Sequence, residues 1–283
     1  MKLMIIAVLV VAGLCLGSFV NALVWRLHEQ ATRKGTTKSD KKYLEQLSIS
    51  RGRSMCPHCK HELAGKDLMP IVSWLSLNGK CRYCKRAISA QYPLVEAATA
   101  TLYVASYVWW PVTLEGAQTA IFVLWLVLLV GFMALVVYDL RWLLLPNRIV
   151  YPLSLIAGVQ AVIAIVAANR PAIALLNTVL AVLVGGGIFY VLFQVSSGKW
   201  IGGGDVRLGW LLGLIVATPA RSLLCIFIAA LGGSLISVPL LLSGRLKRTS
   251  TIPFGPFLIG GAAVVVLFGA SLLQWYQQTF IGL

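Results

Sequence analysis

Long apolar runs alternate with short polar stretches along nearly the whole chain. An α-helix needs about 20 mostly apolar residues to cross a bilayer, so the pattern predicts an all-α membrane protein with about eight transmembrane helices. The chain lacks the short alternating segments of an outer-membrane barrel. The predicted helices cover Leu3–Trp25, Pro93–Trp110, Ala117–Tyr138, Ile149–Ala168, Ala172–Phe193, Val206–Thr218, Leu223–Leu242 and Ile252–Trp275.

Two of these runs carry additional signals. Val206–Thr218 would be only about 20 Å long as a helix, so we expect it to be broken, tilted or partly buried in the bundle. The first run begins like a secretory signal peptide but continues to Trp25 without an Ala-x-Ala cleavage site, which favours a retained membrane helix.

Composition agrees with a membrane protein. Hydrophobic residues make up 59% of the 283 residues and charged residues 12%, with a mean hydropathy of +0.85. Soluble domains carry about 25% charged residues.

The net charge of +15 is concentrated, because 14 of the 24 Lys and Arg residues lie between Arg26 and Arg86. The positive-inside rule explains such a loop better than nucleic-acid binding does, and it predicts a cytoplasmic loop. Alternation then places residues 139–148, 194–205 and 243–251 on the cytoplasmic side and both termini outside.

The basic loop contains a linker and a compact polar module. Residues 27–55 are polar and irregular, and we expect a mobile linker there. Residues 56–92 surround two C-x-x-C pairs, Cys56/Cys59 and Cys81/Cys84. Two such pairs typically provide four thiolates for a tetrahedral Zn²⁺ site, which is structural because no coordination position stays open.

Alternatives for the cysteines are weaker. His58 and His61 are close enough in sequence to replace a ligand, but surface positions suit them better. Disulfides are disfavoured on the reducing side of the membrane. Cys15 and Cys225 stand alone in apolar runs and are expected to be small buried hydrophobic residues.

Two acids stand out in the apolar part. Only nine acids occur, and five lie between Glu29 and Asp67. An acid at a helix centre costs roughly 2.5–3.5 kcal/mol to insert, so Asp139 and Asp205 are predicted to be functional. Both lie at the predicted cytoplasmic ends of their helices. Asp205 directly follows Gly202, Gly203 and Gly204.

Two neighbouring carboxylates can share a proton, so that one acts as acid and the other as base toward a water and a peptide carbonyl. The glycines would permit close approach of a substrate backbone and unusual dihedrals. The alternative is that each Asp caps a helix or pairs with Arg141 or Arg207, and that the glycines form a simple turn. No histidine follows residue 61, and no Ser/His pair or zinc-protease motif competes for the chemistry.

Taken together, these motifs resemble the bacterial type IV prepilin peptidases over nearly the whole chain. Asp139 with Leu145-Pro-Asn147 is similar to the first catalytic aspartate motif, and Gly202–Asp205 to the G-x-G-D motif that holds the second. Other matching stretches are Gly17–Asn21, Arg26-Leu27, Cys56–Cys59, Asp67–Ile71, Ser73–Leu75, Gly79–Cys84, Ile88-Ser89, Tyr92-Pro93, Val95-Glu96 and Pro253–Phe257.

The resemblance implies an intramembrane aspartyl protease of the inner membrane. It would remove basic leaders from prepilins and pseudopilins at the cytoplasmic face, with Asp139 and Asp205 as catalytic residues and Gly202–Gly204 at the substrate. It also implies a zinc-bearing N-terminal module (residues 1–112) and a peptidase domain (113–283). Many members methylate the new N-terminus with S-adenosylmethionine. Asn147, where many members have Asp, and the long linker at 28–55 depart from the family pattern.

Other functions remain possible at this stage. A transporter or channel could use the two carboxylates as an ion or proton relay, although it would favour mid-bilayer acids and repeated halves. A membrane scaffold could bind partners through the zinc module. The archaeal and presenilin-type G-x-G-D peptidases share both aspartates, but the four cysteines weigh against them.

Overall fold

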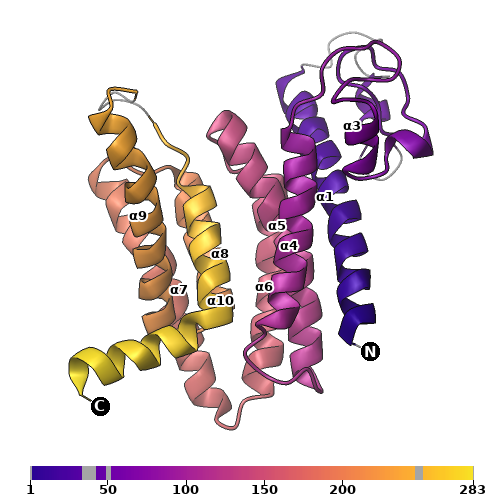
Figure 1. The fold of residues 1–283 in the computed structure, drawn as a ribbon. Coiled ribbons are helices and arrows are strands. Elements are labelled where there is room, and N and C mark those ends of the chain that lie inside the picture. Colours follow the sequence, from indigo (N-terminus) through magenta and orange to yellow (C-terminus); the bar gives the residue numbers. More distant parts are fainter. Residues whose placement is uncertain (1, 34–42, 49–51, 246–250, 283) are drawn as a thin grey trace. The chain divides into compact units, whose positions relative to one another are not determined.

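The computed structural model describes residues 2–33, 43–48, 52–245 and 251–282. The protein is helical in these parts, where extended structure is limited to two isolated bridges, Met55–Glu62 and Lys80–Ala87 (Figure 1). The all-α prediction is confirmed. Each predicted apolar run lies in a helix: α1 Lys2–Thr32, α4 Gln91–Val108, α5 Ala117–Trp142, α6 Asn147–Val166, α7 Pro171–Val195, α8 Gly203–Val216, α9 Pro219–Leu242 and α10 Gly255–Tyr276.

Six of these helices are long and apolar enough to cross a membrane: α1, α5, α6, α7, α9 and α10 with the turn η2 (Gln277–Ile281). The chain is therefore a multi-pass membrane protein. The predicted number of about eight spans is slightly high by this measure, because α4 and the 14-residue α8 do not belong to this set.

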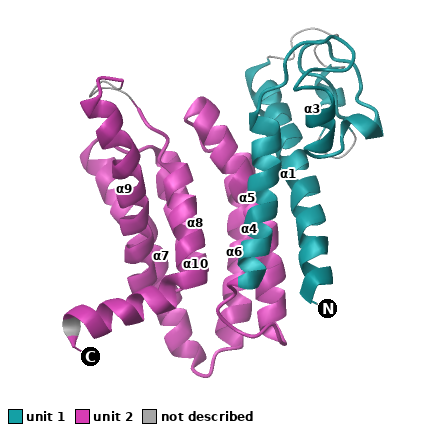
Figure 2. Ribbon diagram, viewed as in Figure 1, with its two compact units in different colours: residues 1–108 teal, residues 109–283 magenta. Residues whose placement is uncertain are grey.

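The chain divides into two compact units, residues 1–108 and 109–283 (Figure 2). Unit 1 contains α1, α4 and the cysteine module between them, and unit 2 contains α5 to α10. The assignment of separate functions to residues 1–112 and 113–283 stays a prediction.

In unit 1, α1 and α4 run antiparallel and pack closely. A Cβ atom added at Gly13 would lie 2.5 Å from the Cα of Ala100, and one at Gly17 would lie 2.7 Å from the Cα of Glu96. Small residues therefore set the distance between the helices, as is usual for helices that pack within a membrane. Asn21 crosses the same interface, since its side-chain amide donates to the Tyr92 carbonyl oxygen at 3.2 Å.

The helix α1 continues to Thr32, where an irregular linker was expected from residue 27. The physical reason is that the extension is held by the chain that follows it. The buried Arg26 guanidinium donates to the carbonyl oxygens of Ser48 (3.1 Å) and Gly52 (3.0 Å), and Gln30 donates to that of Leu47 (2.9 Å). The centre of the predicted linker, 35–42, lies outside the described residues.

In unit 2, the short helix α8 packs among longer helices. Its buried residues include Leu208, Leu211 and Leu212. Glycine makes the contact with α7 possible, because a Cβ atom at Gly209 would lie 2.5 Å from the Gly185 carbonyl oxygen. The helix ends at Val216, because Ala217 has a left-handed conformation (φ +60°), and α9 begins at Pro219. The prediction that this segment is partly buried in the bundle is confirmed.

Candidate functional site: an aspartate pair and a four-cysteine cluster

Asp139 lies in the last turn of α5, and its side chain is buried, with 5% of the residue exposed. The helix ends just beyond it because Leu143 adopts a left-handed conformation (φ +54°) and its N–H donates to the Asp139 carbonyl oxygen at 2.8 Å. Pro146 then precedes α6, which begins at Asn147. The Asp139 carboxylate is therefore held at a sharp corner of the chain, at the end of a membrane helix.

The first residue of α10 binds this carboxylate. The Gly255 N–H donates to Asp139 Oδ2 at 3.0 Å, across 116 residues of sequence. A helix begins with backbone donors that lack intrahelical partners. In α10, Pro256 has no N–H and Phe257 N–H bonds to the Phe254 carbonyl oxygen, so the Gly255 donor is the one directed at the carboxylate. A Cβ atom at Gly255 would lie only 2.7 Å from Asp139 Oδ2, so the contact requires glycine.

Asp205 occupies the third position of α8. Its Oδ2 accepts a hydrogen bond from the Gly202 N–H at 3.3 Å, which caps the helix. The alternative that Asp205 caps its helix is therefore realised in the structure. The capping bond uses one carboxylate oxygen and fixes the orientation of the group. Arg207 does not take this carboxylate as its acceptor here, because its Nε donates to the Gly203 carbonyl oxygen at 3.0 Å.

The three glycines before Asp205 differ from the expectation in one respect. Gly202 is extended and exposed (φ −75°, ψ 148°), and Gly203 and Gly204 form the first turn of α8. None of the three has the positive φ that the idea of unusual dihedrals implied. Gly204 is instead required by packing, because a Cβ atom there would lie 3.0 Å from the Leu145 Cβ.

Leu145 joins the two aspartate regions. Its side chain lies against Gly204, and a Cβ atom at Gly255 would lie 3.4 Å from its Cδ2. The first turns of α8 and α10 thus meet the corner after α5 at one side chain. Because Gly255 binds Asp139 and Gly204 precedes Asp205, this shared contact places the two aspartates in one region of unit 2. Two carboxylates in such a place can share a proton.

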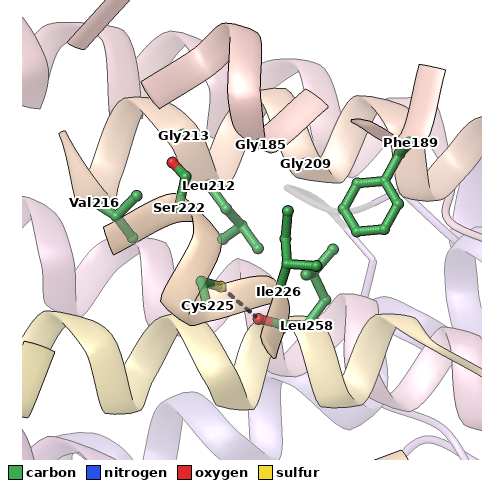
Figure 3. A pocket seen from close by; sticks show the side chains of 10 residues that line it. All are labelled: Gly185, Phe189, Gly209, Leu212, Gly213, Val216, Ser222, Cys225, Ile226 and Leu258. Carbon is green, nitrogen blue, oxygen red and sulfur yellow. Dashed lines mark hydrogen bonds between the residues drawn. The ribbon is translucent and has the colours of Figure 1, made fainter. Parts of the chain in front are cut away.

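A small cavity lies elsewhere in unit 2, between α7, α8, α9 and α10 (Figure 3). Its volume is about 10 Å³, which is room for roughly one water molecule. Its walls are mostly apolar, and its two polar side chains are already engaged: Ser222 donates to the Ala181 carbonyl oxygen at 2.9 Å, and the Cys225 thiol to that of Leu258 at 3.6 Å. The cavity is a packing gap and cannot hold a peptide.

In unit 1, the four predicted cysteines come together. The sulfur atoms of Cys56, Cys59, Cys81 and Cys84 all lie within 4.8 Å of one another, and those of Cys56 and Cys84 are 3.9 Å apart. A tetrahedral Zn²⁺ with Zn–S bonds of about 2.3 Å requires sulfur–sulfur distances of about 3.8 Å, so the cluster fits this metal.

The two C-x-x-C turns have the same local geometry. The residue after each pair has a positive φ, Lys60 at +57° and Lys85 at +60°, and its N–H donates to the carbonyl oxygen of the first cysteine of its pair. Each turn closes with an isolated bridge. Burial raises the pKa of the Cys56 thiol to about 12, and a bound cation would offset this by stabilising the thiolate.

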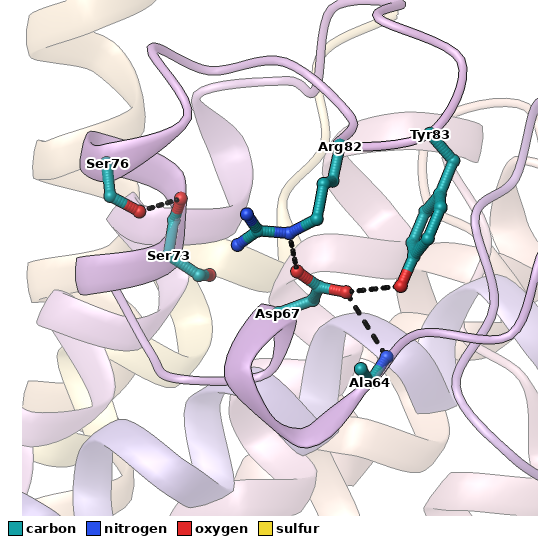
Figure 4. Close-up of polar contacts among 6 residues, drawn as sticks. All are labelled: Ala64, Asp67, Ser73, Ser76, Arg82 and Tyr83. Atoms are coloured by element: carbon teal, nitrogen blue, oxygen red, sulfur yellow. Dashed lines mark hydrogen bonds and ion pairs between the residues drawn. The ribbon is translucent and has the colours of Figure 1, made fainter.

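Asp67 connects two segments of the cysteine module through hydrogen bonds (Figure 4). Its side chain is only 4% exposed and accepts hydrogen bonds from Arg82 Nε (2.6 Å), the Tyr83 hydroxyl (3.0 Å) and the Ala64 N–H (3.2 Å). Burial alone would raise the pKa of Asp67, but these donors outweigh it and hold the pKa below its usual range. Asp67 therefore links the segment between the two C-x-x-C turns to the second turn.

Comparison with known proteins identifies two family models that match successive parts of the chain. The family model described as the bacterial peptidase A24 N-terminal domain matches residues 11–110, and that of the type IV leader peptidase family matches residues 126–273. The chain belongs to the type IV leader peptidase family. It is accordingly a membrane-embedded peptidase.

Named relatives match over most of their length. A protein of Aeromonas salmonicida (strain A449) is 30% identical over 290 residues, which cover 95% of this chain and 92% of the relative. One of Pseudomonas aeruginosa (30%, 95% and 92%) and one of Bacillus subtilis (29%, 83% and 90%) also match. All three are named prepilin leader peptidase/N-methyltransferase. No solved structure matches the chain.

Two residues of the aspartate site were not assigned from the sequence. Gly255 donates to Asp139, and Leu145 packs between the two regions. The sequence did contain a signal for both residues. Leu145 belongs to the Leu-Pro-Asn stretch and Gly255 to Pro253–Phe257, and both stretches resemble the family.

Proposed function

We propose that this chain is a prepilin peptidase of the bacterial inner membrane that cuts with Asp139 and Asp205. The observation that carries the proposal is that Leu145 lies against both Gly204, which precedes Asp205, and Gly255, which binds Asp139, although 66 residues separate the two aspartates in sequence. The family and the names of the relatives support prepilins and pseudopilins as the substrates.

The chemistry needs one protonated and one ionised carboxyl group. The ionised group takes a proton from a water molecule, whose oxygen then forms a bond to the scissile carbonyl carbon. The protonated group gives its proton to the carbonyl oxygen. When the tetrahedral intermediate collapses, the C–N bond breaks, the departing amine takes a proton from the dyad, and one hydroxyl group of the intermediate returns its proton to the dyad as the C=O bond re-forms. The pair ends with one proton again and can enter another cycle. Because the pair titrates as a unit, the two roles are not divided between the residues.

The local geometry suits this reaction. The Gly255 N–H fixes one oxygen of Asp139, and the Gly202 N–H fixes one oxygen of Asp205, so each carboxylate keeps its second oxygen for reaction. Gly202, Gly203 and Gly204 would let an extended substrate backbone approach Asp205, and Gly202 is exposed for this purpose.

The cofactors belong to unit 1. Cys56, Cys59, Cys81 and Cys84 would hold a structural Zn²⁺, which supplies folding energy and takes no part in proteolysis. The relatives' names support methylation of the new N-terminus with S-adenosylmethionine. The described part of unit 1 has only isolated bridges and no βαβ unit, so it does not form the common nucleotide-binding fold, and we assign no residues to this cofactor.

The charge distribution supports a cytoplasmic position for the cysteine module and for both aspartates, with the two chain termini outside. A basic leader would emerge from the membrane on that same side. Asp139 and Asp205 lie at helix ends, as cleavage next to a membrane helix requires.

The test is processing of a co-expressed prepilin in membranes that carry Asp139→Asn or Asp205→Asn. We expect cleavage to fall by about 100-fold to 10,000-fold in each, since general acid–base groups contribute about 10²–10⁴-fold. Glu115→Gln, which removes an exposed acid of unit 2, should cleave normally. Mass spectrometry of the product reports the cleavage site and N-methylation together. Full cleavage by either aspartate variant would refute the dyad.

A further inference from the structure

The cysteine module presents an apolar face to its surroundings. It consists of Leu68, Met69, Val72 and Leu75, which are 40%, 52%, 55% and 60% exposed. They lie on and beside the short elements η1 (Gly65–Asp67) and α3 (Val72–Ser76), between the two C-x-x-C turns. Isolated exposed apolar side chains are common, but four within eight residues on a small polar module indicate a contact surface.

The opposite side of α3 faces the module. The Trp74 indole N–H donates to the Ile88 carbonyl oxygen at 3.1 Å, and its ring lies against Gly79, where a Cβ atom would be 2.9 Å from the ring. This fixes the direction of α3, so that Val72 and Leu75 point away from the module. The outward position of the apolar face is therefore built into the fold.

A buried carboxylate sets how deep this face lies. The Ile71 N–H donates to Glu96 Oε2 at 2.7 Å, and Glu96 is 5% exposed within the α1–α4 pair. Ile71 has a φ of +59°, which is costly for a β-branched residue, and the Val72 N–H closes a γ-turn on the Pro70 carbonyl oxygen at 2.5 Å. The module is thus joined to the side of the helix pair through a strained turn.

The point of attachment lies well inside the apolar part of α1. Glu96 packs against Gly17, nine residues before Arg26, the first charge after the apolar run. Nine residues of helix correspond to about 13 Å. Side chains lean toward the N-terminus of their helix, here toward the Arg26 end, so Ile71 lies roughly 10 Å below Arg26. Interfacial elements bury their apolar faces about 5–10 Å into the headgroup and acyl boundary.

The flanking charges fit the same surroundings. Lys66, Lys80, Lys85 and Arg86 belong to the same module and are exposed. Basic residues at a membrane surface are attracted to anionic headgroups by about 1 kcal/mol each. A small module that exposes both apolar and basic side chains matches a bilayer interface better than the interior of a protein.

We propose that the cysteine module is anchored in the membrane, with Leu68, Met69, Val72 and Leu75 inserted into the lipid where α1 leaves the bilayer. The occupant of this face is phospholipid, continuous with the lipid around α1 and α4. The module then lies at the bilayer interface at a fixed depth. It is not a polar domain surrounded by water. The proposal is independent of the aspartate chemistry.

The experiment places a photo-crosslinking amino acid at Leu75 in the full-length protein in native membranes. After irradiation, mass spectrometry identifies what is attached. We expect phospholipid adducts at Leu75 in a yield similar to that at Leu94, an exposed residue of α4, and at least fivefold above that at Glu62, an exposed residue of the first C-x-x-C turn. A repeat at Val72 guards against one unsuitable position.

Three results would overturn the proposal. Attachment of Leu75 and Val72 to peptides of residues 109–283 would show that the face is covered within the molecule. Attachment to a second protein would show a docking surface. A lipid yield no higher than that at Glu62 would show a face in water. Each labelled protein is first required to melt within a few degrees of the unlabelled one, so that misfolding cannot produce these results.

Discussion

The cysteine cluster and the aspartate pair are built in opposite ways. The four thiols come from 29 consecutive residues, and two turns of the same geometry bring them together. The aspartate site joins residues from three distant parts of the chain, since 66 residues separate Asp139 from Asp205 and 116 separate Asp139 from Gly255. The cluster is a local structure, and the pair depends on how the helices of unit 2 pack.

This difference predicts different weaknesses. A small polar module gains most of its stability from a bound metal, for which about 10–16 kcal/mol is typical of structural zinc. The aspartate site needs no metal, but its geometry depends on close packing contacts, such as Gly255 against Asp139 and Gly204 against Leu145. The cysteine module should therefore unfold when it loses its metal. The aspartate site should lose activity after a small displacement that leaves the fold intact.

The largest effect in free energy is expected from losing a zinc ligand. Cys84→Ser should reduce bound zinc from about one per chain to a small fraction, because three thiolates leave the coordination incomplete. Limited proteolysis should then cut within residues 52–90 at least about tenfold faster, as the metal supplies most of the folding energy there. The helices of unit 2 should keep their protection from hydrogen exchange.

Cys15→Ser is the matched control, because Cys15 is a cysteine of α1 outside the cluster. The prediction that it is buried was wrong, since Cys15 is exposed, whereas Cys225 is buried as expected. It should leave zinc content and proteolysis unchanged. Loss of protection throughout unit 2 in Cys84→Ser would contradict the separation between the two regions.

The next effect concerns Gly255. Gly255→Ala places a methyl group 2.7 Å from Asp139 Oδ2, so the carboxylate must move. A displacement of about 1 Å at a reacting group costs on the order of 100-fold in rate. We expect kcat for prepilin cleavage to fall by about that factor with KM changed less than about twofold. Measured unfolding should stay close to that of the parent protein.

Gly260→Ala provides the comparison within the same helix, since a Cβ atom there meets nothing within 4 Å. It should cleave at the parent rate. If Gly255→Ala were equally active, the contact with Asp139 would not position the catalytic group. If it lost stability and activity together, its role would be structural.

The same contrast explains how far the sequence predicts this protein. The zinc ligands follow from the C-x-x-C spacing because the geometry of each turn is local. The eight helical segments follow from apolar runs, of which Val206–Thr218 is too short to predict an ordinary membrane span. Asp139 and Asp205 stand out because acids are rare among apolar residues, and the distribution of Lys and Arg predicts that both lie on the same side.

What the sequence lacks is long-range geometry. The bond from Gly255 to Asp139 depends on the start of α10 meeting the end of α5, which no spacing rule encodes. The extension of α1 to Thr32 was missed because polar residues predicted a linker, whereas Arg26 and Gln30 bind the following chain. The glycines before Asp205 suggested unusual dihedrals, but Gly204 is needed for its contact with Leu145.

The smallest predicted effect tests whether the hydrogen bonds and ion pair of Asp67 stabilise the cysteine module in addition to its metal. Asp67 has a lowered pKa, so its ionised form stabilises the folded module above the ordinary carboxyl range, and this contribution is lost as the pH falls through the lower folded-state pKa. Asp67→Asn should therefore destabilise the module by about 1 kcal/mol near neutral pH. The difference from the parent protein should shrink below about pH 4.

The measurement is denaturant-induced zinc release, followed with a coloured chelator at several pH values. Acid also protonates the thiolates, but this affects both proteins and cancels in the difference between them. Glu62→Gln is the control, because the Arg53–Glu62 pair is exposed on both sides (80% and 61%) and such pairs contribute less than about 1 kcal/mol. A difference for Asp67→Asn that persisted undiminished in acid would mean that the side chain stabilises the module by packing and its charge does not contribute.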